Sequence, residues 1–145
     1  MLESVFITLV ALVIYTYLGY PVIIIALGKW FQKKRVQTLS SLPAVSWVVP
    51  SYNEETIIKE KIEGLLTLDY PKDKLEIIVI TDGSTDATPS IAASYDQVKV
   101  LHSPERKGKS AAENRAMKFV SGEIVVFNDA NTIVGKGALK ELVKH

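Results

Sequence analysis

Four short apolar stretches, each followed by a polar cluster and then by a helix-like segment, constrain the fold of this 145-residue chain most strongly. The stretches are Ala44 to Val49, Leu75 to Ile80, Val98 to Leu101 and Ile124 to Phe127. The segment after the first stretch has apolar residues at helical spacing: Ile57, Ile58, Ile62, Leu65 and Leu66. Regular alternation of strand and helix predicts an α/β fold. We expect a Rossmann-like, mainly parallel sheet with helices on both faces, because crossovers between parallel strands are right-handed.

Residues with strong local preferences suggest where these elements begin and end. Pro50 should end the first strand, and Ser51 or Asn53 should cap the helix that follows. Thr88 and Pro89 have the pattern of a helix start, with the threonine as N-cap and proline at the first helical position. The third helix is predicted over Ser110 to Val120, and a fourth begins at Gly137.

Polar clusters follow each of the four predicted strands. They are Pro50 to Glu54, Thr81 to Asp86, Ser103 to Lys109, and Asn128 to Asn131. In open α/β sheets, ligands bind outside the carboxyl ends of the strands. The sequence therefore predicts that all four clusters meet at one edge of the sheet and form a single site.

The segment Val5 to Leu27 contains no charged side chain. As a helix it would span about 35 Å, which is enough to cross a bilayer core. A cleaved signal peptide is the alternative, but the apolar run is long for one, and Glu3 rather than a basic residue precedes it. We therefore predict a retained single-pass anchor, partnered with the membrane.

Basic residues follow this run and none precedes it: Lys29, Lys33, Lys34 and Arg35. The positive-inside rule then puts the remainder of the chain in the cytoplasm. The predicted domains are residues 1–35 as anchor and basic flank, 36–43 as linker, and 44–145 as the folded domain.

The composition excludes several functional classes. The chain has 17 Lys and Arg against 16 Asp and Glu, so no basic field indicates a nucleic-acid partner. It contains no cysteine and therefore neither a disulfide framework nor a thiolate metal site. His102 and His145 are too few and too far apart for a zinc site, and His102 is expected at a strand end.

Each polar cluster also has a purely structural explanation. Asn, Asp and Ser cap helices and form turns without any ligand. Tyr52 is not needed for capping, and its ring offers a face on which a base could stack. Arg106, Lys107 and Lys109 could offer positive charge to an anionic ligand or form a solvated basic turn.

Two common nucleotide-binding motifs are incomplete or missing in this sequence. Gly108-Lys109-Ser110 has the end of a P-loop pattern, but the first glycine of that pattern is replaced by Ser103, so a P-loop nucleotide binder is a remote alternative. No G-x-G-x-x-G follows the first strand, which disfavours a dinucleotide-binding domain.

Taken in order, "VVPSYNEE", "IIVITDGSTDAT", "RKGKSAAENRAM" and "EIVVFNDANTIV" closely resemble the family-2 glycosyltransferases, which have a GT-A fold. The resemblance covers Ala44 to the C-terminus. It implies a nucleotide-diphosphate sugar as donor, with a UDP-sugar expected, a divalent Mg²⁺ or Mn²⁺ ion as cofactor, and a glycan or lipid acceptor.

The resemblance also implies roles for individual residues. Pro50, Tyr52 and Glu54 match positions that flank the nucleobase and ribose, and Asp82 matches the aspartate that accepts a hydrogen bond from uracil. Lys109 matches a basic residue near the nucleotide. Asp129 and Asn131 fall on the outer positions of the family's Asp-x-Asp motif, which contacts ribose and holds the metal.

The sequence departs from the family pattern at three places. Thr81 stands where an aspartate often precedes Asp82, and Asn131 replaces the second aspartate, which predicts weaker or shared metal binding. No segment follows that matches the family's catalytic base and acceptor site. We therefore expect residues 44–145 to be the donor-binding half of a GT-A glycosyltransferase domain. The alternative is a non-catalytic or vestigial nucleotide-sugar-binding fragment.

Overall fold

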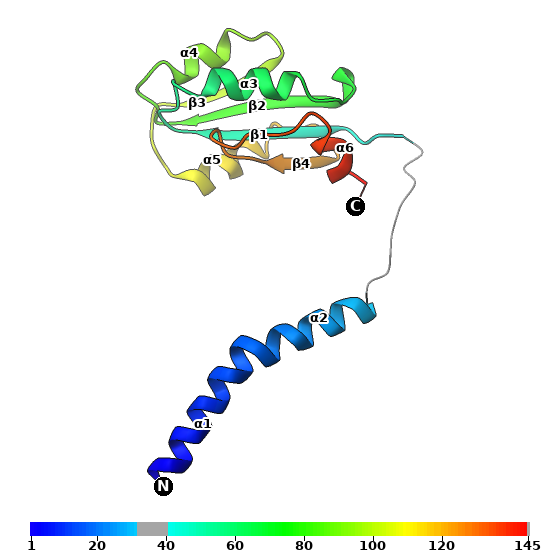
Figure 1. Cartoon of the computed structure of the whole chain (residues 1–145). Coiled ribbons are helices and arrows are strands. Elements are labelled where there is room, and N and C mark those ends of the chain that lie inside the picture. Colours follow the sequence, from blue (N-terminus) through cyan, green and yellow to red (C-terminus); the bar gives the residue numbers. More distant parts are fainter. Residues whose placement is uncertain (32–40, 145) are drawn as a thin grey trace. The chain divides into compact units, whose positions relative to one another are not determined.

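The computed structural model describes residues 1–31 and 41–144, which separate into an N-terminal helix and a folded domain (Figure 1). The predicted linker 36–43 lies mostly outside the described residues, as do Lys33, Lys34, Arg35 and His145.

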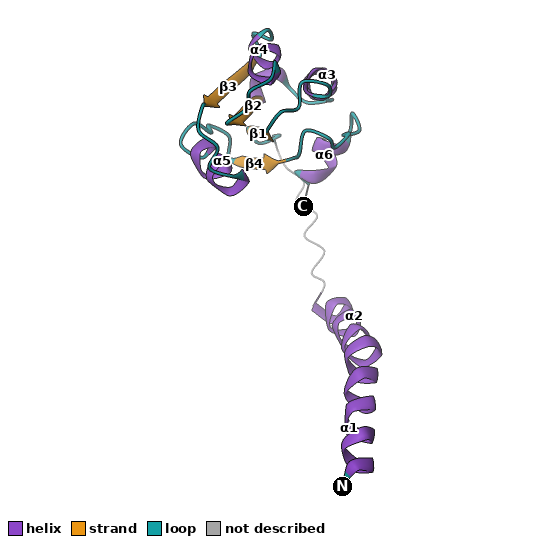
Figure 2. Ribbon diagram, turned by 90° about the vertical axis from the view of Figure 1, so that its left-hand side faces the viewer, coloured by secondary structure: helices purple, strands orange, loops and turns teal. Residues whose placement is uncertain are grey.

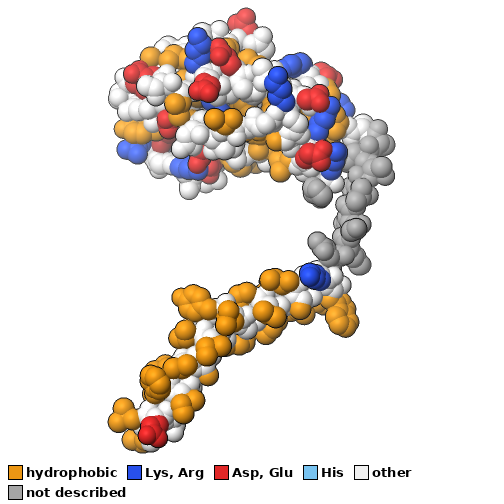
Figure 3. All heavy atoms as spheres, in the orientation of Figure 1, with side chains coloured by type: hydrophobic (Ala, Val, Ile, Leu, Met, Phe, Trp, Pro, Cys, Tyr) orange, Lys and Arg blue, Asp and Glu red, His pale blue; other side chains and the backbone are white. Residues whose placement is uncertain are grey.

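The N-terminal unit is one helical segment, Leu2–Phe31, that is long and apolar enough to cross a membrane. None of its residues is buried. It consists of α1 (Leu2–Ile14), a π-helical turn η1 (Tyr15–Gly19) and α2 (Tyr20–Phe31). Figure 3 shows hydrophobic side chains along the helix surface, in contrast to the mixed polar and charged surface of the domain.

Pro21 explains the π turn inside this helix. A proline ring clashes with the carbonyl four residues earlier and donates no hydrogen bond. Here the helix widens just before Pro21, and the Tyr20 amide donates to the Tyr15 carbonyl, five residues back. The helix bends in this region (Figure 1), as expected where a π turn interrupts the regular ladder.

The domain contains a parallel four-stranded sheet in the order β3-β2-β1-β4. The strands are β1 (Val45–Ser51), β2 (Leu75–Asp82), β3 (Val98–Ser103) and β4 (Ile124–Phe127). The helices are α3 (Ile58–Leu66), α4 (Thr88–Ala93), α5 (Lys109–Ala116) and α6 (Ala138–Leu142), with a short 3₁₀ turn, η2 (Lys72–Lys74). The predicted α/β class and its parallel sheet are confirmed.

Helices cover both faces of the sheet (Figure 2). On one face, Val45, Trp47 and Val49 of β1 pack with residues of α3, α4 and α6. On the other face, Val48 of β1 packs with Ala112 and other residues of α5. Residues of β1 alternate between the two clusters, as the two-residue period of a strand requires. Burying each large aliphatic side chain contributes about 1.5–3 kcal/mol to this core.

Pro50 does not end β1, contrary to the prediction. The strand continues to Ser51, which pairs with Thr81 of β2. The Val48 carbonyl accepts the Asn128 amide on the β4 side, where the regular β4 pairing ends at Phe127. Two residues on, Pro50 faces that same side, beyond the end of β4, so its missing N–H breaks no ladder bond.

The predicted helix caps were also wrong. Helix α3 begins only at Ile58, and no side chain caps it; Asn53 bonds instead to the loop after β2. Helix α4 starts at Thr88, one residue before the expected first position. The Thr88 amide donates a hydrogen bond to Asp86 Oδ1 at 3.0 Å. Helix α5 ends at Ala116, four residues before the predicted end.

Candidate donor-binding site

A cavity of about 250 Å³ lies where the carboxyl ends of β1, β2 and β4 meet the start of α5. All seven residues assigned to the site from the sequence line it: Pro50, Tyr52, Glu54, Asp82, Lys109, Asp129 and Asn131. The parallel sheet brings them together because all of its strands point the same way. Their individual roles remain predictions.

Tyr52 forms one wall of the cavity, and its ring is already stacked. The Arg106 guanidinium lies 3.8 Å from the ring centroid, a cation–π contact. One face of the ring, where a base was expected to stack, is therefore covered by Arg106. Arg106 also lines the cavity, so a positive charge is available to an anionic ligand.

Five hydrogen bonds hold residues 53–55, after β1, against residues 84–88, after β2. Asn53 Oδ1 accepts from the Thr85 amide at 2.9 Å, and the Asn53 amide donates to Ser84. Asn53 adopts a φ of 53°, a conformation that asparagine tolerates. The remaining three bonds join Glu54 N to Thr88 Oγ1, Glu55 N to Asp86 Oδ2, and Ala87 N to Glu55 Oε2.

Polar residues of these two motifs are thus divided between two tasks. One set fixes the two loops to each other, and the other set, Tyr52, Glu54 and Asp82, lines the cavity. Burial alone would raise the pKa of Asp86, but hydrogen bonds from Thr88 and from the Glu55 amide leave it below its usual 3.8. Apart from Tyr52, the sequence did not separate the two sets, because acidic residues occur in both.

Asp82 is almost fully buried, with 5% of its surface exposed, and its carboxylate is extensively bonded. Oδ2 accepts from the backbone amides of Lys107 and Gly108 at 2.8 and 2.7 Å, and Oδ1 lies 3.4 Å from Arg115. Asp82 therefore shapes the loop between β3 and α5. These same amides would have to point at phosphate in a P-loop, so the geometry does not favour that alternative.

Lys109 and Asp129 form an ion pair across the cavity, with 2.6 Å between Nζ and Oδ1. The hydrogen bond that Lys109 donates to Asp129 raises the pKa of Lys109 above its usual 10.5. In the sequence Asp129 has no basic neighbour, and the pair forms because α5 begins at Lys109. The Lys107 side chain contacts Glu105 instead and does not line the cavity.

The oxygen ligands at this site suit a divalent metal ion only in part. Among the described residues, no group of three or more His, Asp or Glu side chains could hold one. Asp129 offers one carboxylate and Asn131 one amide oxygen, and Mg²⁺ in proteins is commonly bound by one or two such ligands together with substrate phosphates. The residues therefore fit an ion shared with a diphosphate rather than one held by protein alone.

Lys61 was missed by the sequence analysis although it contacts the same segment. It is 6% exposed, and its ammonium donates to Asn128 Oδ1 and to the Thr132 carbonyl. Burial lowers the pKa of Lys61 below its usual 10.5, and the nearby Asp129 offsets this in part. A signal was present in the sequence, since Lys61 lies four residues after Ile57 and three after Ile58, on the apolar stripe of α3.

His102, expected at a strand end, lies in β3. Its Nδ1 is hydrogen-bonded with Thr81 Oγ1 at 2.8 Å. Thr81 is itself fully buried, and its carbonyl accepts from Arg115 at 3.0 Å. The threonine at this position is therefore bonded within the sheet and does not line the cavity.

Comparison with known proteins identifies the relatives of this chain. Over 114 residues it is 37% identical to the probable glycosyltransferase YdaM of Bacillus subtilis, covering 74% of this chain and 27% of the relative. Over 127 residues it is 37% identical to the beta-monoglucosyldiacylglycerol synthase of Nostoc sp., covering 81% and 27%. The chain thus spans about a quarter of the length of these relatives.

Two solved structures share the fold. The mannosyltransferase PcManGT from Pyrobaculum calidifontis, in complex with GDP-Man and Mn²⁺, is 33% identical with a TM-score of 0.79, covering 99% of this chain and 44% of that one. Staphylococcus aureus TarS in complex with UDP-GlcNAc is 34% identical with a TM-score of 0.65, covering 68% and 30%. The model of glycosyl transferase family 2 matches residues 46–145, and the chain belongs to that family.

Proposed function

We propose that this chain is the donor-binding part of a membrane-anchored glycosyltransferase, which transfers a sugar from a nucleotide-diphosphate sugar to an acceptor hydroxyl. The observation that carries the proposal is the single cavity lined by residues from four separate polar clusters. Both solved structures named above are complexes with a nucleotide sugar. Their donors differ in the base, so a UDP-sugar and a GDP-sugar are both tested.

The nucleobase and ribose would lie near Pro50, Tyr52, Glu54 and Asp82, at the ends of β1 and β2. The diphosphate would lie toward Lys109 and Asp129, where the positive charge of the lysine is available. Asp129 and Asn131 would hold the divalent ion, Mg²⁺ or Mn²⁺, which stabilises the negative charge that develops on the leaving nucleoside diphosphate. Lys109 would stabilise the same charge from the side of α5.

The anchor is part of the proposal. Lys29 lies in the last turn of α2, whereas Glu3 lies in the first turn of α1. By the positive-inside rule this arrangement supports a cytoplasmic domain, with the helix as a single-pass span. One relative is a synthase of a glucosylated diacylglycerol, a lipid. An anchored domain would remain close to an acceptor of this kind, so the acceptor class is a membrane lipid or a glycan assembled at the membrane.

Calorimetry with the full chain in detergent micelles tests the donor site. UDP-glucose and GDP-mannose are titrated in the presence of Mn²⁺ into the wild type, Asp129→Ala and the exposed control Asp96→Ala. We expect the wild type and the control to bind one of the two donors, and Asp129→Ala to lose at least tenfold in affinity. Failure of the wild type to bind either donor would refute the assignment of the site.

A second measurement separates a transferase from the binding-only alternative. The chain is reconstituted in liposomes with and without diacylglycerol, and release of nucleoside diphosphate from the bound donor is followed. Release that depends on the acceptor lipid supports transfer by this chain. Tight donor binding without such release supports the alternative of a nucleotide-sugar-binding fragment.

A further inference from the structure

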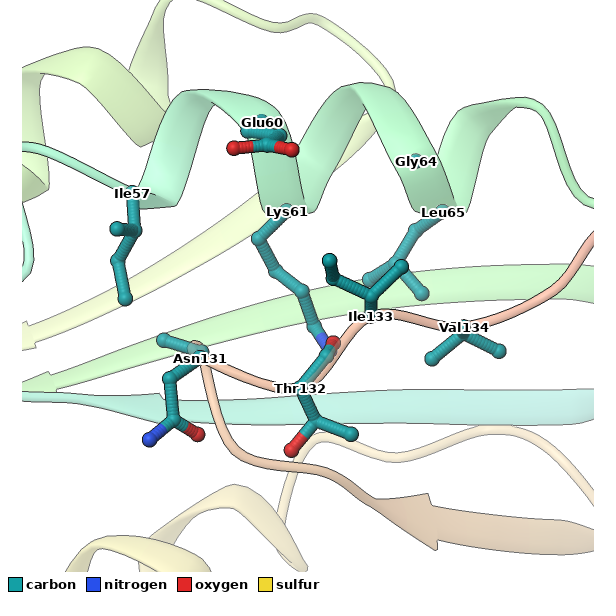
Figure 4. A pocket seen from close by; sticks show the side chains of 10 residues that line it. Ile57, Glu60, Lys61, Gly64, Leu65, Asn131, Thr132, Ile133 and Val134 are labelled. Carbon is teal, nitrogen blue, oxygen red and sulfur yellow. The ribbon is translucent and has the colours of Figure 1, made fainter.

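Lys61 bridges the two ends of the segment that holds the candidate metal ligands. Its ammonium donates to the Asn128 side chain, just before Asp129, and to the Thr132 carbonyl, just after Asn131. The three residues between these contacts are Asp129, Ala130 and Asn131. In Figure 4 the lysine side chain reaches from α3 to this loop, beside Thr132.

Apart from the ion pair between Lys109 and Asp129, the segment has few other restraints. Asp129, Asn131 and Thr132 are exposed, and Ile133 next to them is 87% exposed. Ala130 is buried in the core, and the Thr132 amide donates to the Asp129 carbonyl within the loop itself. The ammonium of Lys61 therefore adds hydrogen bonds between this loop and α3 to the apolar packing of Ala130.

A lysine at this position is costly if its only task is packing. Lys61 lies on the apolar stripe of α3, where an unbranched apolar side chain of similar length would avoid burying an ammonium. A second cavity, of about 320 Å³, lies between α3 and residues 130–134, and the lysine stem forms part of its wall (Figure 4). Ala130 and Asn131 line both cavities. The segment therefore separates two cavities, so its conformation depends on contacts such as those of Lys61.

We propose that Lys61 is a positioning residue that holds Asp129 and Asn131 in the arrangement required to bind the metal–diphosphate unit of the donor. The proposal rests on the proposed function, because it concerns the same site. Lys61 does not contact the donor; it acts through Asn128 and Thr132. Its charge also lies close enough to interact with Asp129.

Lys61→Met tests this role, since methionine keeps the length and removes the ammonium. Lys59→Met, an exposed lysine on the same helix, is the matched control. UDP binding to the full chain is measured by calorimetry in Mn²⁺ and in EDTA, and Mn²⁺ bound to the UDP complex is counted from the loss of the free-ion signal in electron paramagnetic resonance. Urea unfolding, followed by Trp47 fluorescence, verifies that the domain remains folded.

We expect Mn²⁺ to tighten UDP binding at least tenfold in the wild type and in Lys59→Met. In Lys61→Met this gain should fall to about twofold or less, while the affinity for UDP in EDTA stays within about twofold of the wild type. A full Mn²⁺-dependent gain in Lys61→Met would overturn the proposal, and so would an equal loss of affinity in EDTA. Wild type that binds UDP without any gain from Mn²⁺ would also overturn it. If the wild type does not bind UDP, the same titrations are made with GDP, and wild type that binds neither nucleotide would overturn the proposed function itself.

Discussion

Replacing Asp82 by asparagine tests whether this carboxylate organises the loop between β3 and α5. The change keeps the shape of the side chain but leaves one oxygen where two accepted bonds. The cheaper orientation keeps that oxygen on the Lys107 and Gly108 amides, now 2.8 and 2.7 Å from Oδ2, and turns the new NH₂ group toward Arg115. The amide bonds then become neutral, and the guanidinium loses its acceptor.

The size of the effect follows from these contacts. Hydrogen bonds to a charged group contribute about 1.5–3 kcal/mol and neutral ones about 0.5–1.5 kcal/mol, so each amide bond weakens by about 1 kcal/mol. The Arg115 contact is long and its side chain is 27% exposed, which limits its share to under about 1 kcal/mol. We therefore expect Asp82→Asn to destabilise the loop by about 2–3 kcal/mol.

Hydrogen exchange measures this effect directly and without nucleotide, so that it is independent of any contact between Asp82 and a base. A loss of about 2–3 kcal/mol corresponds to exchange that is roughly 30- to 150-fold faster at the Lys107 and Gly108 amides. Asp96→Asn, on an exposed turn, serves as the control and should change neither amide. If both amides in Asp82→Asn exchange within threefold of the wild-type rate, the carboxylate does not hold this loop.

Three further predictions follow from other contacts. Gly122→Ala should lower the free energy of unfolding by about 1–3 kcal/mol in urea titrations, because the added Cβ would lie 2.5 Å from the Ser46 amide nitrogen. The lowered pKa of Asp86 stabilises the fold above pH 3.8, and this contribution is lost as the pH falls through the lower folded value; thermal unfolding of Asp86→Asn should therefore depend less on pH in that window. Lys109→Met should tighten Mn²⁺ binding without nucleotide by about two- to fivefold, measured by electron paramagnetic resonance, because Asp129 loses its competing partner.

The convergence of the site could be predicted from the sequence because it depends on topology alone. Once the strands are parallel, the residues after each strand must lie at the same edge, whatever their identity. Asp82 and Asp129 therefore line one cavity although 47 positions separate them in the sequence. The boundaries of the elements were harder to predict, since Pro50 reads as a strand end and is tolerated within β1 only because β4 is shorter.

The division of tasks among the polar residues could not be read from the sequence. Asp86 helps to join two loops, whereas Asp82 lines the cavity, and nothing in residue type distinguishes these two aspartates. The distinction depends on which way each side chain points after the strand ends. Lys61 was missed for a different reason: one charged residue on an apolar helix face is easily treated as an interruption of the pattern.

The charges around Asp129 and Asn131 bear on how a donor and a metal ion would arrive at the proposed site. The segment carries one carboxylate, Asp129, while Lys109 is paired with it and the ammonium of Lys61 lies behind it. At Asp129 itself, a free divalent cation would compete with the ammonium groups of Lys109 and Lys61 for a single carboxylate, so its binding there alone should be weak. A nucleoside diphosphate that already carries the ion brings enough negative charge to reverse this balance. It would also let Lys109 turn from Asp129 to phosphate. We therefore expect donor and metal to bind as one unit, with Asn131 in place of a second aspartate being sufficient for that purpose.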